Sequence, residues 1–392
     1  MNTESQVVVV GAGPAGLVAA LSLQAHGINP LVLEGRAPED PLPGSRALFV
    51  HRESMSIIDS VSPGTGRLIS DAGIMWSGRA TWYAGRQVFR RQDQISGHRY
   101  EDIAPYASLP QSRTVEILRA ACAARGVPVQ TSTTVTGVRP SDTAVIVETN
   151  GGPVRAAYVI AADGAHSNIR RAVDIGLNGP KLDGYHVVVD VLPEGGLPTE
   201  RILHYRVPEF GGRNMLVIPF TGGFQLDIQA KSWEDAQELE DVAAWLPTVA
   251  PGVATRDIGW VSTYRFSSVV ADSMIDESRR VLLVGEAAHL FPPFGARGMN
   301  SAIADSDAAA TAIALDARSG GRSGVERFAS FRLRAAMTNA KAATRGFHVL
   351  HPDRRTQIMQ RAAAGMSRMV WQAGRWLEDA PYDAMARAGG RY

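Results

Sequence analysis

Three glycines near the start of the chain have the spacing that binds a dinucleotide. The segment Gly11-Ala12-Gly13-Pro14-Ala15-Gly16 reads G-x-G-x-x-G and directly follows a short apolar run, Val7–Val10. Glycines in this pattern allow a tight turn, close approach of the backbone to a pyrophosphate, and close packing of a helix on a strand. The helix that follows presents free N–H groups and the positive end of its dipole to the phosphates.

The elements that must position this turn are a strand, a helix and a second strand. Apolar periodicity predicts a strand at Val7–Val10, a helix over about Pro14–His26 that ends at Gly27, and a strand at Leu31–Glu34. Glu34 ends the second strand, where an acid accepts hydrogen bonds from ribose hydroxyls. Its charge disfavours a 2′-phosphate, so this turn should bind FAD or NAD rather than NADP.

Two later segments also combine glycine with polar residues. One is Ala162-Asp163-Gly164-Ala165-His166-Ser167-Asn168-Ile169-Arg170. The other runs from Gly285-Glu286-Ala287-Ala288-His289 through Pro292-Pro293-Phe294-Gly295 to Gly298-Met299-Asn300. A buried strand at Arg280–Gly285 and a helix over about Gly298–Leu315 are predicted around the second segment.

In this order the segments resemble the class A flavoprotein monooxygenases, the para-hydroxybenzoate-hydroxylase family. The segment at Asp163-Gly164 resembles the family's DG motif, which helps to bind FAD and is associated with NAD(P)H. The later segment resembles its GD motif and flavin-ring loop. This chain departs from the family pattern at Glu286, where the family has aspartate, so the carboxylate is displaced by about one C–C bond, ~1.5 Å.

The resemblance implies a set of site residues. Arg46, in Ser45-Arg46-Ala47, matches an arginine near the flavin that influences movement of the ring, and Pro293 is implied to lie over the ring; these two are the expected catalytic residues. Gln111, with Glu116, matches the start of a helix that lines the FAD. The expected FAD contacts are Gly11, Gly13, Pro14, Ala15, Gly16, Glu34, Gly35, Arg36, Arg46, Gln111, Val135, Asp163, Gly164, Glu286, Gly295, Ala296, Arg297, Gly298, Met299 and Asn300.

The resemblance also implies the reaction. FAD, reduced by NADH or NADPH, would add molecular oxygen at C4a, and the hydroperoxide would hydroxylate a phenolic or polycyclic aromatic substrate in a site from which water is excluded. The helix N-terminus near Gly298 would stabilise the anionic reduced flavin. His51, His98 and His204 are candidates for a base that removes a phenol proton, or are structural histidines. An epoxidase, a Baeyer–Villiger-type oxygenase, a reductase or a flavin-binding protein without catalysis are the alternatives.

The predicted fold is α/β: a glutathione-reductase-type Rossmann FAD-binding domain interleaved with a mostly antiparallel substrate sheet, with a helical C-terminus. The expected domains are 1–71, 101–180 and 271–392 for FAD, and 72–100 and 181–270 for substrate. Alternation predicts strands at His186–Val191, Met215–Pro219 and Phe224–Gln229, with a single helix near Trp233–Leu246. Residues 72–106 are expected to be irregular, and the tail over 325–386 to be helical.

Composition excludes several classes of partner. Forty Lys+Arg against 39 Asp+Glu leave a net charge of +1, which gives no electrostatic reason to bind nucleic acid. No apolar run reaches the length of a membrane span, and the first residues do not form a signal peptide. The single cysteine, Cys122, suits a reducing compartment. We therefore expect a cytoplasmic protein, monomer or homodimer, with no metal-ligand spacing.

Overall fold

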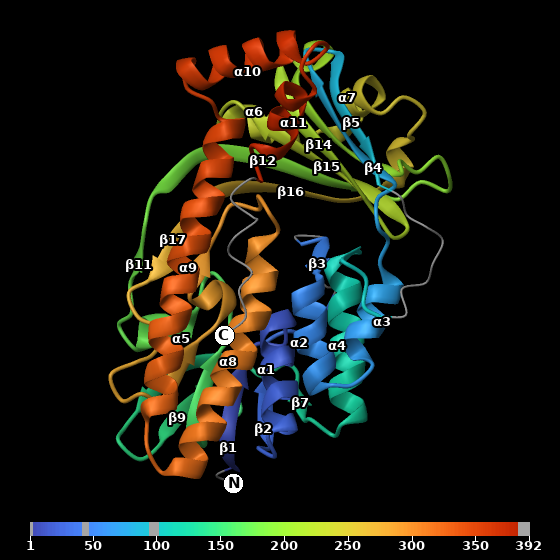
Figure 1. The fold of residues 1–392 in the computed structure, drawn as a ribbon. Coiled ribbons are helices and arrows are strands. Elements are labelled where there is room, and N and C mark those ends of the chain that lie inside the picture. Colours follow the sequence, from blue (N-terminus) through green and yellow to red (C-terminus); the bar gives the residue numbers. More distant parts are fainter. Residues whose placement is uncertain (1–2, 41–46, 94–101, 383–392) are drawn as a thin grey trace.

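Two seven-stranded sheets, with the helices between and around them, make up most of the described part of the molecule (Figure 1). The computed structural model describes residues 3–40, 47–93 and 102–382. One sheet lies among the long helices, and the other forms a separate layer beyond the N-terminal end of α8 (Arg297–Ser319). Segments far apart in the sequence contribute to each layer.

The first sheet contains the predicted strand–helix–strand unit. Its strands follow the order β7-β2-β1-β10-β9-β8, and β18 also pairs with β10. β1 is parallel to both β2 and β10, whereas β9 runs antiparallel to β10. The bounds are β1 (Thr3–Val10), β2 (Pro30–Leu33), β7 (Val129–Gln130), β8 (Val135–Pro140), β9 (Val145–Thr149), β10 (Val154–Ala161) and β18 (Val281–Leu283).

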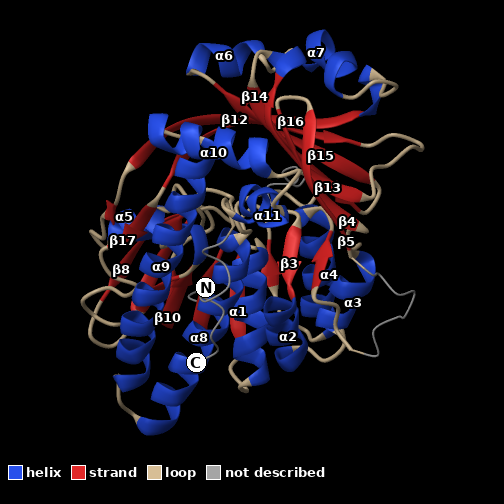
Figure 2. Ribbon diagram, turned by 45° about the horizontal axis from the view of Figure 1, so that its top comes forward, coloured by secondary structure: helices blue, strands red, loops and turns tan. Residues whose placement is uncertain are grey.

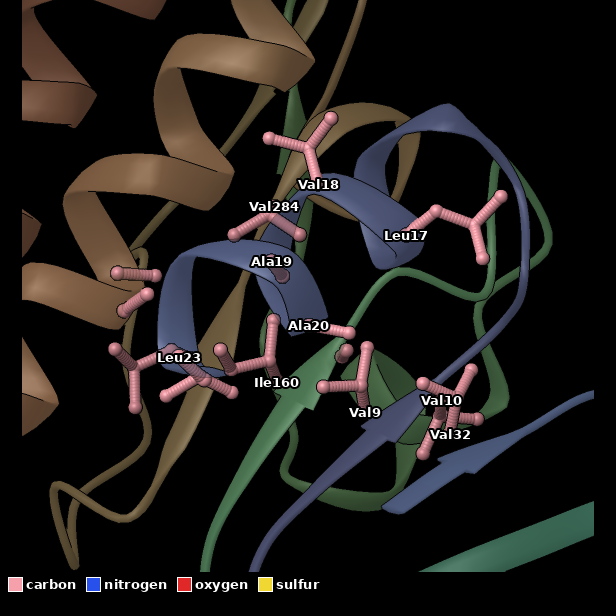
Figure 3. Close-up of a cluster of buried hydrophobic side chains, with 14 of the residues drawn as sticks. Val9, Val10, Leu17, Val18, Ala19, Ala20, Leu23, Val32, Ile160 and Val284 are labelled. Carbon is pink, nitrogen blue, oxygen red and sulfur yellow. The ribbon is translucent and has the colours of Figure 1, made fainter. Parts of the chain in front are cut away.

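Helix α1 (Pro14–Ala25) is buried by its neighbours on several sides. Leu17, Val18 and Leu23 are fully buried, and they belong to the same apolar cluster as Val9 and Ile160 of the sheet (Figure 3). α1 packs against α8 and also against α4 (Gln111–Ala124). A helix that is apolar on all faces must be enclosed by protein, and this enclosure holds the start of α1 in place.

The second sheet has seven strands in the order β16-β12-β15-β14-β13-β4-β5. Its pairs are antiparallel except for β13 and β4, which run parallel. One face packs under α6 (Trp233–Glu238) and α7 (Val242–Val249), which lie on the outer side (Figure 2). The bounds are β4 (Gly78–Tyr83), β5 (Arg86–Gln92), β12 (Lys181–Val191), β13 (Glu200–Val207), β14 (Arg213–Phe220), β15 (Gly223–Ala230) and β16 (Ile258–Ser267).

The expectation that residues 72–106 are irregular was wrong. Strands β4 and β5 form a hairpin there, and β4 pairs with β13. Ala84 and Gly85 both have positive φ, at 47° and 77°, which is the backbone of a two-residue hairpin turn. The Ala-Gly sequence is a weak signal for such a turn, and the arginines of β5 obscure the alternation that indicates a strand.

The single helix predicted over 233–246 was also wrong, because the chain forms two helices there. α6 ends at Glu238, and Asp241 then precedes α7. The helical tail is confirmed over the described residues as three helices, α9 (Ser323–Leu350), α10 (Arg354–Met366) and α11 (Trp371–Asp379). α10 begins after Pro352, where Asp353 caps it by accepting a hydrogen bond from the amide of Thr356.

The remaining strands form a three-stranded and a two-stranded sheet, β11-β17-β19 and β3-β6, and three shorter helices accompany them. The bounds are β3 (Phe49–His51), β6 (Tyr106–Ser108), β11 (Leu177–Asn178), β17 (Val269–Ala271), β19 (His289–Leu290), α2 (Arg52–Val61), α3 (Thr65–Ala72) and α5 (Asn168–Ala172). Short 3₁₀ helices lie at Pro208–Phe210, Thr255–Asp257 and Gly285–Ala287. The mixed α/β fold with a helical C-terminal region is confirmed. Within the described ranges, no helix is both long and apolar enough to cross a bilayer.

Candidate active site

The G-x-G-x-x-G turn joins the end of β1 to the start of α1. Gly11 has φ of 102°, and a Cβ atom there would overlap the carbonyl oxygen of Ala162. A Cβ at Gly16 would overlap the carbonyl oxygen of Gly11, so Gly16 sets how closely α1 packs on the turn. A Cβ at Gly13 would meet no protein atom within 4 Å, because this residue faces a cavity. Gly11 and Gly16 therefore allow close packing of the backbone, whereas Gly13 leaves the cavity wall open.

Glu34 follows β2 and lies at the same turn. Its Oε2 accepts a hydrogen bond from the amide of Ala12 at 2.6 Å, and its Oε1 accepts one from the amide of Arg36 at 3.0 Å. Both oxygens are thus held beside the cavity, where Glu34, Gly35 and Arg36 all form part of the wall. This position matches the predicted role of an acid at the ribose of a bound nucleotide.

The Asp163-Gly164 turn lies directly beside the fingerprint. Parallel pairing of β1 with β10 brings Ala162 to Gly11, so the next two residues face the same cavity. Asp163 Oδ2 accepts the amide of Ile169 at 3.2 Å, while its Oδ1 is buried and has no hydrogen-bond partner among the described residues. Gly164 has φ of 81° and open space beside it. A buried acceptor without a partner beside open space suits a ligand donor.

The later glycine segment reaches the cavity through the start of α8. Ala296 precedes the helix in the left-handed conformation, with φ of 52°. No side chain among the described residues caps α8, so its first amides remain open toward the cavity wall formed by Ala296, Gly298 and Met299. A Cβ at Gly298 would again meet no protein atom within 4 Å. This helix end can stabilise a partial negative charge on a bound group.

A buried ionic group anchors this segment. Asp305 of α8 accepts hydrogen bonds from His289 Nε2 at 2.7 Å, from Arg332 Nε at 2.5 Å and from the amide of Gly285 at 3.1 Å. Burial alone would raise the pKa of Asp305, but Arg332 and His289 lower it to about 2. Asp305 therefore ties the start of α8 to the Gly285 turn. Because His289 is buried and hydrogen-bonded to Asp305, its role here is structural.

One cavity of about 970 Å³ connects these three segments. Most of the predicted site residues line it: Gly11, Gly13, Pro14, Ala15, Glu34, Gly35, Arg36, Gln111, Val135, Asp163, Gly164, Glu286, Pro293, Gly295, Ala296, Arg297, Gly298 and Met299. The side of Gly13, Gly164 and Gly298 that a Cβ would fill is open. Together with the unpaired Asp163 Oδ1, these features fit a long, phosphate-bearing cofactor such as FAD.

Among the described residues, two predicted site residues stand apart from the cavity lining. Gly16 is a packing residue, as described above. The Asn300 side chain accepts from the amide of His51 and the hydroxyl of Ser54, and it donates to the carbonyls of Phe49 and Ala296. Asn300 thus joins the α8 loop to β3 rather than facing the cavity. Arg46 lies outside the described residues.

The candidate bases have different positions. His51 lines the cavity, and its Nε2 lies 3.4 Å from the carbonyl oxygen of Gly295. Burial lowers the pKa of His51. His204 instead lines a separate hollow on the α7 side of the second sheet, where burial lowers its pKa to about 4. His98 lies outside the described residues.

The residues at the end of the cavity beside the second sheet were not among the site residues predicted from the sequence. Leu216, Ile218, Gln225 and Asp227 of the second sheet line this end of the cavity, together with an aromatic wall formed by Phe49, Trp76 and Tyr106. Arg201 and Tyr382 also line this end. Alternation along Phe224–Ala230 could have indicated a polar face on β15, but not what that face meets.

Comparison with known proteins agrees with this geometry. A family model described as FAD binding domain matches residues 4–343. The flavin-dependent monooxygenase of Mycobacteroides abscessus is 27% identical over 329 residues, which cover 76% of this chain and 65% of that protein. The 3-amino-4-hydroxybenzoate 2-monooxygenase of Streptomyces cremeus is 26% identical over 96% of each chain. The p-nitrophenol 4-monooxygenase of Pseudomonas putida shares the fold, with a TM-score of 0.80, 22% identity and full coverage of both chains.

The match covers only part of the length of some relatives. The chain spans 65% of the Mycobacteroides abscessus protein and 60% of the 12-dehydrotetracycline 5-monooxygenase/anhydrotetracycline 6-monooxygenase of Streptomyces rimosus. The family match itself extends over the three glycine-bearing segments of the cavity and all seven strands of the second sheet. Because the model of the FAD binding domain matches residues 4–343, this chain belongs to the family of proteins that carry that domain.

Proposed function

We propose that this protein is an FAD-dependent monooxygenase that uses NADH or NADPH and molecular oxygen to hydroxylate a phenolic or polycyclic aromatic substrate. One observation carries the proposal: the fingerprint turn at Gly11–Gly16 and the α8 loop at Gly295–Gly298 border a single cavity, which continues to an aromatic wall. Relatives named as monooxygenases of aromatic compounds support the same reaction.

Each part of the cavity has a separate task in this proposal. The start of α1 and Gly13 would hold the pyrophosphate, and Glu34 the ribose. The open amides at the start of α8 would face the ring system, where they favour negative charge. Bound FAD would supply hydride acceptance from NAD(P)H and activation of oxygen. Pro293 and Arg46 are proposed to act at the ring.

The aromatic wall is proposed to bind the substrate ring and to exclude water. Phe49 and Tyr106 stack with centroids 4.3 Å apart, and Trp76 lies 5.3 Å from Phe49. Such surfaces bury a planar ligand and keep the reacting region dry. We assign residues 72–100 and 181–270 to substrate binding, and residues 1–71, 101–180 and 271–392 to FAD. Pairing of β4 and β5 with the second sheet supports this division.

We further propose that the protein acts in the cytoplasm, as a monomer or homodimer. The single cysteine, Cys122, is buried, and burial raises the pKa of its thiol to about 12, which suits an unreactive residue in a reducing compartment.

The test is whether purified protein binds FAD and couples NAD(P)H oxidation to hydroxylation. Phenols should accelerate NADH or NADPH oxidation and yield a product that carries one oxygen atom from labelled O₂. Protein that takes up no FAD would overturn the whole proposal. Protein that binds FAD but gives only hydrogen peroxide with every aromatic compound would overturn the hydroxylase assignment but leave the FAD assignment standing.

A further inference from the structure

The second sheet presents a carboxylate to the cavity that belongs to none of the glycine motifs. Asp227 lies on β15, where alternate residues Phe224, Leu226 and Ile228 pack into the apolar cluster under α6 and α7. The residues between them, Gln225 and Asp227, therefore face the opposite side and line the cavity. Asp227 is only 9% exposed, so its charge lies in a region with little water.

A buried histidine holds this carboxylate. His186 on β12 is 3% exposed, and its Nδ1 lies 2.5 Å from Asp227 Oδ1. A carboxylate oxygen accepts hydrogen bonds, so Nδ1 carries the hydrogen and donates it. The ring is fixed between Phe266, at 4.5 Å, and Phe294, at 6.1 Å between centroids. Oδ1 of Asp227 thus accepts a hydrogen bond from His186, whereas Oδ2 accepts none from the described residues.

Neighbouring elements place further titratable side chains near the His186–Asp227 pair. His351, after α9, lies 5.4 Å from the His186 ring, and its pKa is lowered to about 4, mainly by burial, so it is neutral near pH 7. Tyr264 of β16 is opposite His186 in the ladder. Burial raises the pKa of Tyr382, whose hydroxyl accepts a hydrogen bond from Arg201 of β13 at 2.8 Å.

The nearby Arg201 forms its ion pair with an acid other than Asp227. It pairs with Glu378 of α11, which is also buried, and Glu378 accepts a hydrogen bond from Thr81 at 2.7 Å. Asp227 lies opposite Leu216 of β14, which lies opposite Leu203 of β13, so the backbones of Asp227 and Arg201 are two strand spacings, about 10 Å, apart across the sheet and two residues apart along β13. Arg201 is thus ion-paired with Glu378, whereas Asp227 is hydrogen-bonded by His186 in the described part of the chain and lies near enough to Tyr382 for its charge to act on that hydroxyl.

We propose that Asp227, oriented by His186, is the general base that accepts the hydroxyl proton of a phenolic substrate. The phenol O–H bond breaks, its electron pair stays on the oxygen, and the proton passes to Asp227, while His186 retains its Nδ1 hydrogen. The phenolate oxygen then donates electron density to the ortho and para ring carbons. Once the ring carbon has gained one oxygen atom of O₂, it loses its proton to the second oxygen atom, which leaves as water, and the ring becomes aromatic again while Asp227 returns its proton to the phenolic oxygen. This assignment rests on the proposed function.

The decisive variant is Asp227→Asn, which keeps the size of the side chain and an oxygen to accept from His186. Loss of a general base typically lowers the rate by about 10²- to 10⁴-fold, so kcat near pH 7 should fall at least about 100-fold. The remaining rate should rise with pH in step with ionisation of the phenol itself. FAD content and melting temperature should stay at wild-type values. Asp183→Asn is the matched control, because Asp183 is an exposed carboxylate on the same strand as His186.

Binding gives a second measurement that needs no turnover. The oxidised holoenzyme is titrated with 4-nitrophenol, whose neutral and anionic forms differ in colour. Wild type should select the neutral phenol, because Asp227 accepts its hydrogen bond and repels the anion. Asp227→Asn should lose this selection and bind the anion at least as well. Equal selection in both proteins, or no binding to wild type, would overturn the assignment.

Two further outcomes complete the test. Asp227→Glu keeps a carboxylate and should retain the pH profile of the wild type; a profile that instead follows ionisation of the phenol would overturn the proposal. A large loss of kcat in His51→Asn with none in Asp227→Asn would place the base at the α8 loop and do the same. Failure of wild-type protein to hydroxylate any phenol refutes the proposed function separately, and the binding measurement still decides the role of Asp227.

Discussion

Replacing Gly13 with alanine should separate FAD binding from folding. Gly13 has φ of −77° and ψ of −178°, a conformation open to alanine, and its Cβ would meet no protein atom within 4 Å. The apoprotein should therefore be as stable as wild type, or more stable by about 0.4–1 kcal/mol, because alanine restricts the unfolded chain. The added methyl group instead occupies the space where the phosphates are proposed to approach the start of α1.

The expected loss of affinity follows from the contacts at that turn. A hydrogen bond to a charged group is worth about 1.5–3 kcal/mol, so displacing the pyrophosphate from one amide should weaken FAD binding about 10- to 150-fold. The measurement is fluorescence titration of the stripped protein with FAD, beside urea unfolding of the same apoprotein.

Gly16→Ala is the control, because its Cβ would overlap the carbonyl oxygen of Gly11. This variant should destabilise the apoprotein by about 1–3 kcal/mol, as overpacking does. Wild-type FAD affinity in Gly13→Ala, or a loss of apoprotein stability equal to that of Gly16→Ala, would refute the assignment of the open face of Gly13 to the cofactor.

Three other predictions concern buried charges. Asp305→Asn should lower the free energy of unfolding at pH 7 by about 3–5 kcal/mol in urea titrations, because it removes the carboxylate facing buried Arg332. Since the pKa of Asp305 is held at about 2, below the ordinary aspartate value of 3.8, wild type keeps this contribution above pH 3.8 and loses it as the pH falls toward 2; equal acid sensitivity in the variant would contradict this. The pKa of His204 is lowered to about 4, so its neutral form suits the folded state above pH 6.5, and stability declines as the pH falls from 6.5 toward 4. His204→Gln should therefore lose less stability than wild type between pH 7 and pH 5, with FAD affinity unchanged; a full wild-type loss would count against the assignment. Glu378→Gln should release α11, because it removes the charge that pairs with buried Arg201; faster cleavage of the C-terminal region in limited proteolysis checks this, and wild-type resistance would refute it.

The glycine motifs could be predicted because their chemistry is local. Gly11, Gly13 and Gly16 follow an apolar run and open a helix, and Glu34 comes at the end of the next strand. These features depend on spacing along a few residues of chain. Asp163 could be assigned only by resemblance, yet it lies at the cavity for a simple reason, which is that β10 pairs with β1.

The predictions failed where the structure depends on distant pairing. The hairpin at β4 and β5 is stabilised by β13, more than 100 residues later, and its Ala84-Gly85 turn has little local signal. The break between α6 and α7 likewise could not be predicted from the residue types, because both helices contribute apolar residues to the same cluster. The contact of Asn300 with the cofactor stays a prediction; its side chain forms hydrogen bonds to β3 and α2, which no local pattern specifies.

What the sequence alone determined is local: the turn at Gly11–Gly16, the acid at Glu34 and a helix that begins near Gly298. Short-range rules of backbone conformation are sufficient for these elements, whereas the role of the Gly298 helix at the flavin was implied by the family resemblance. The substrate end of the cavity was decided only by tertiary structure, because Asp227, His186 and the aromatic wall come from strands that meet through long-range pairing. A side chain's face on a strand follows from alternation, but the surface that it meets follows from how whole sheets pack.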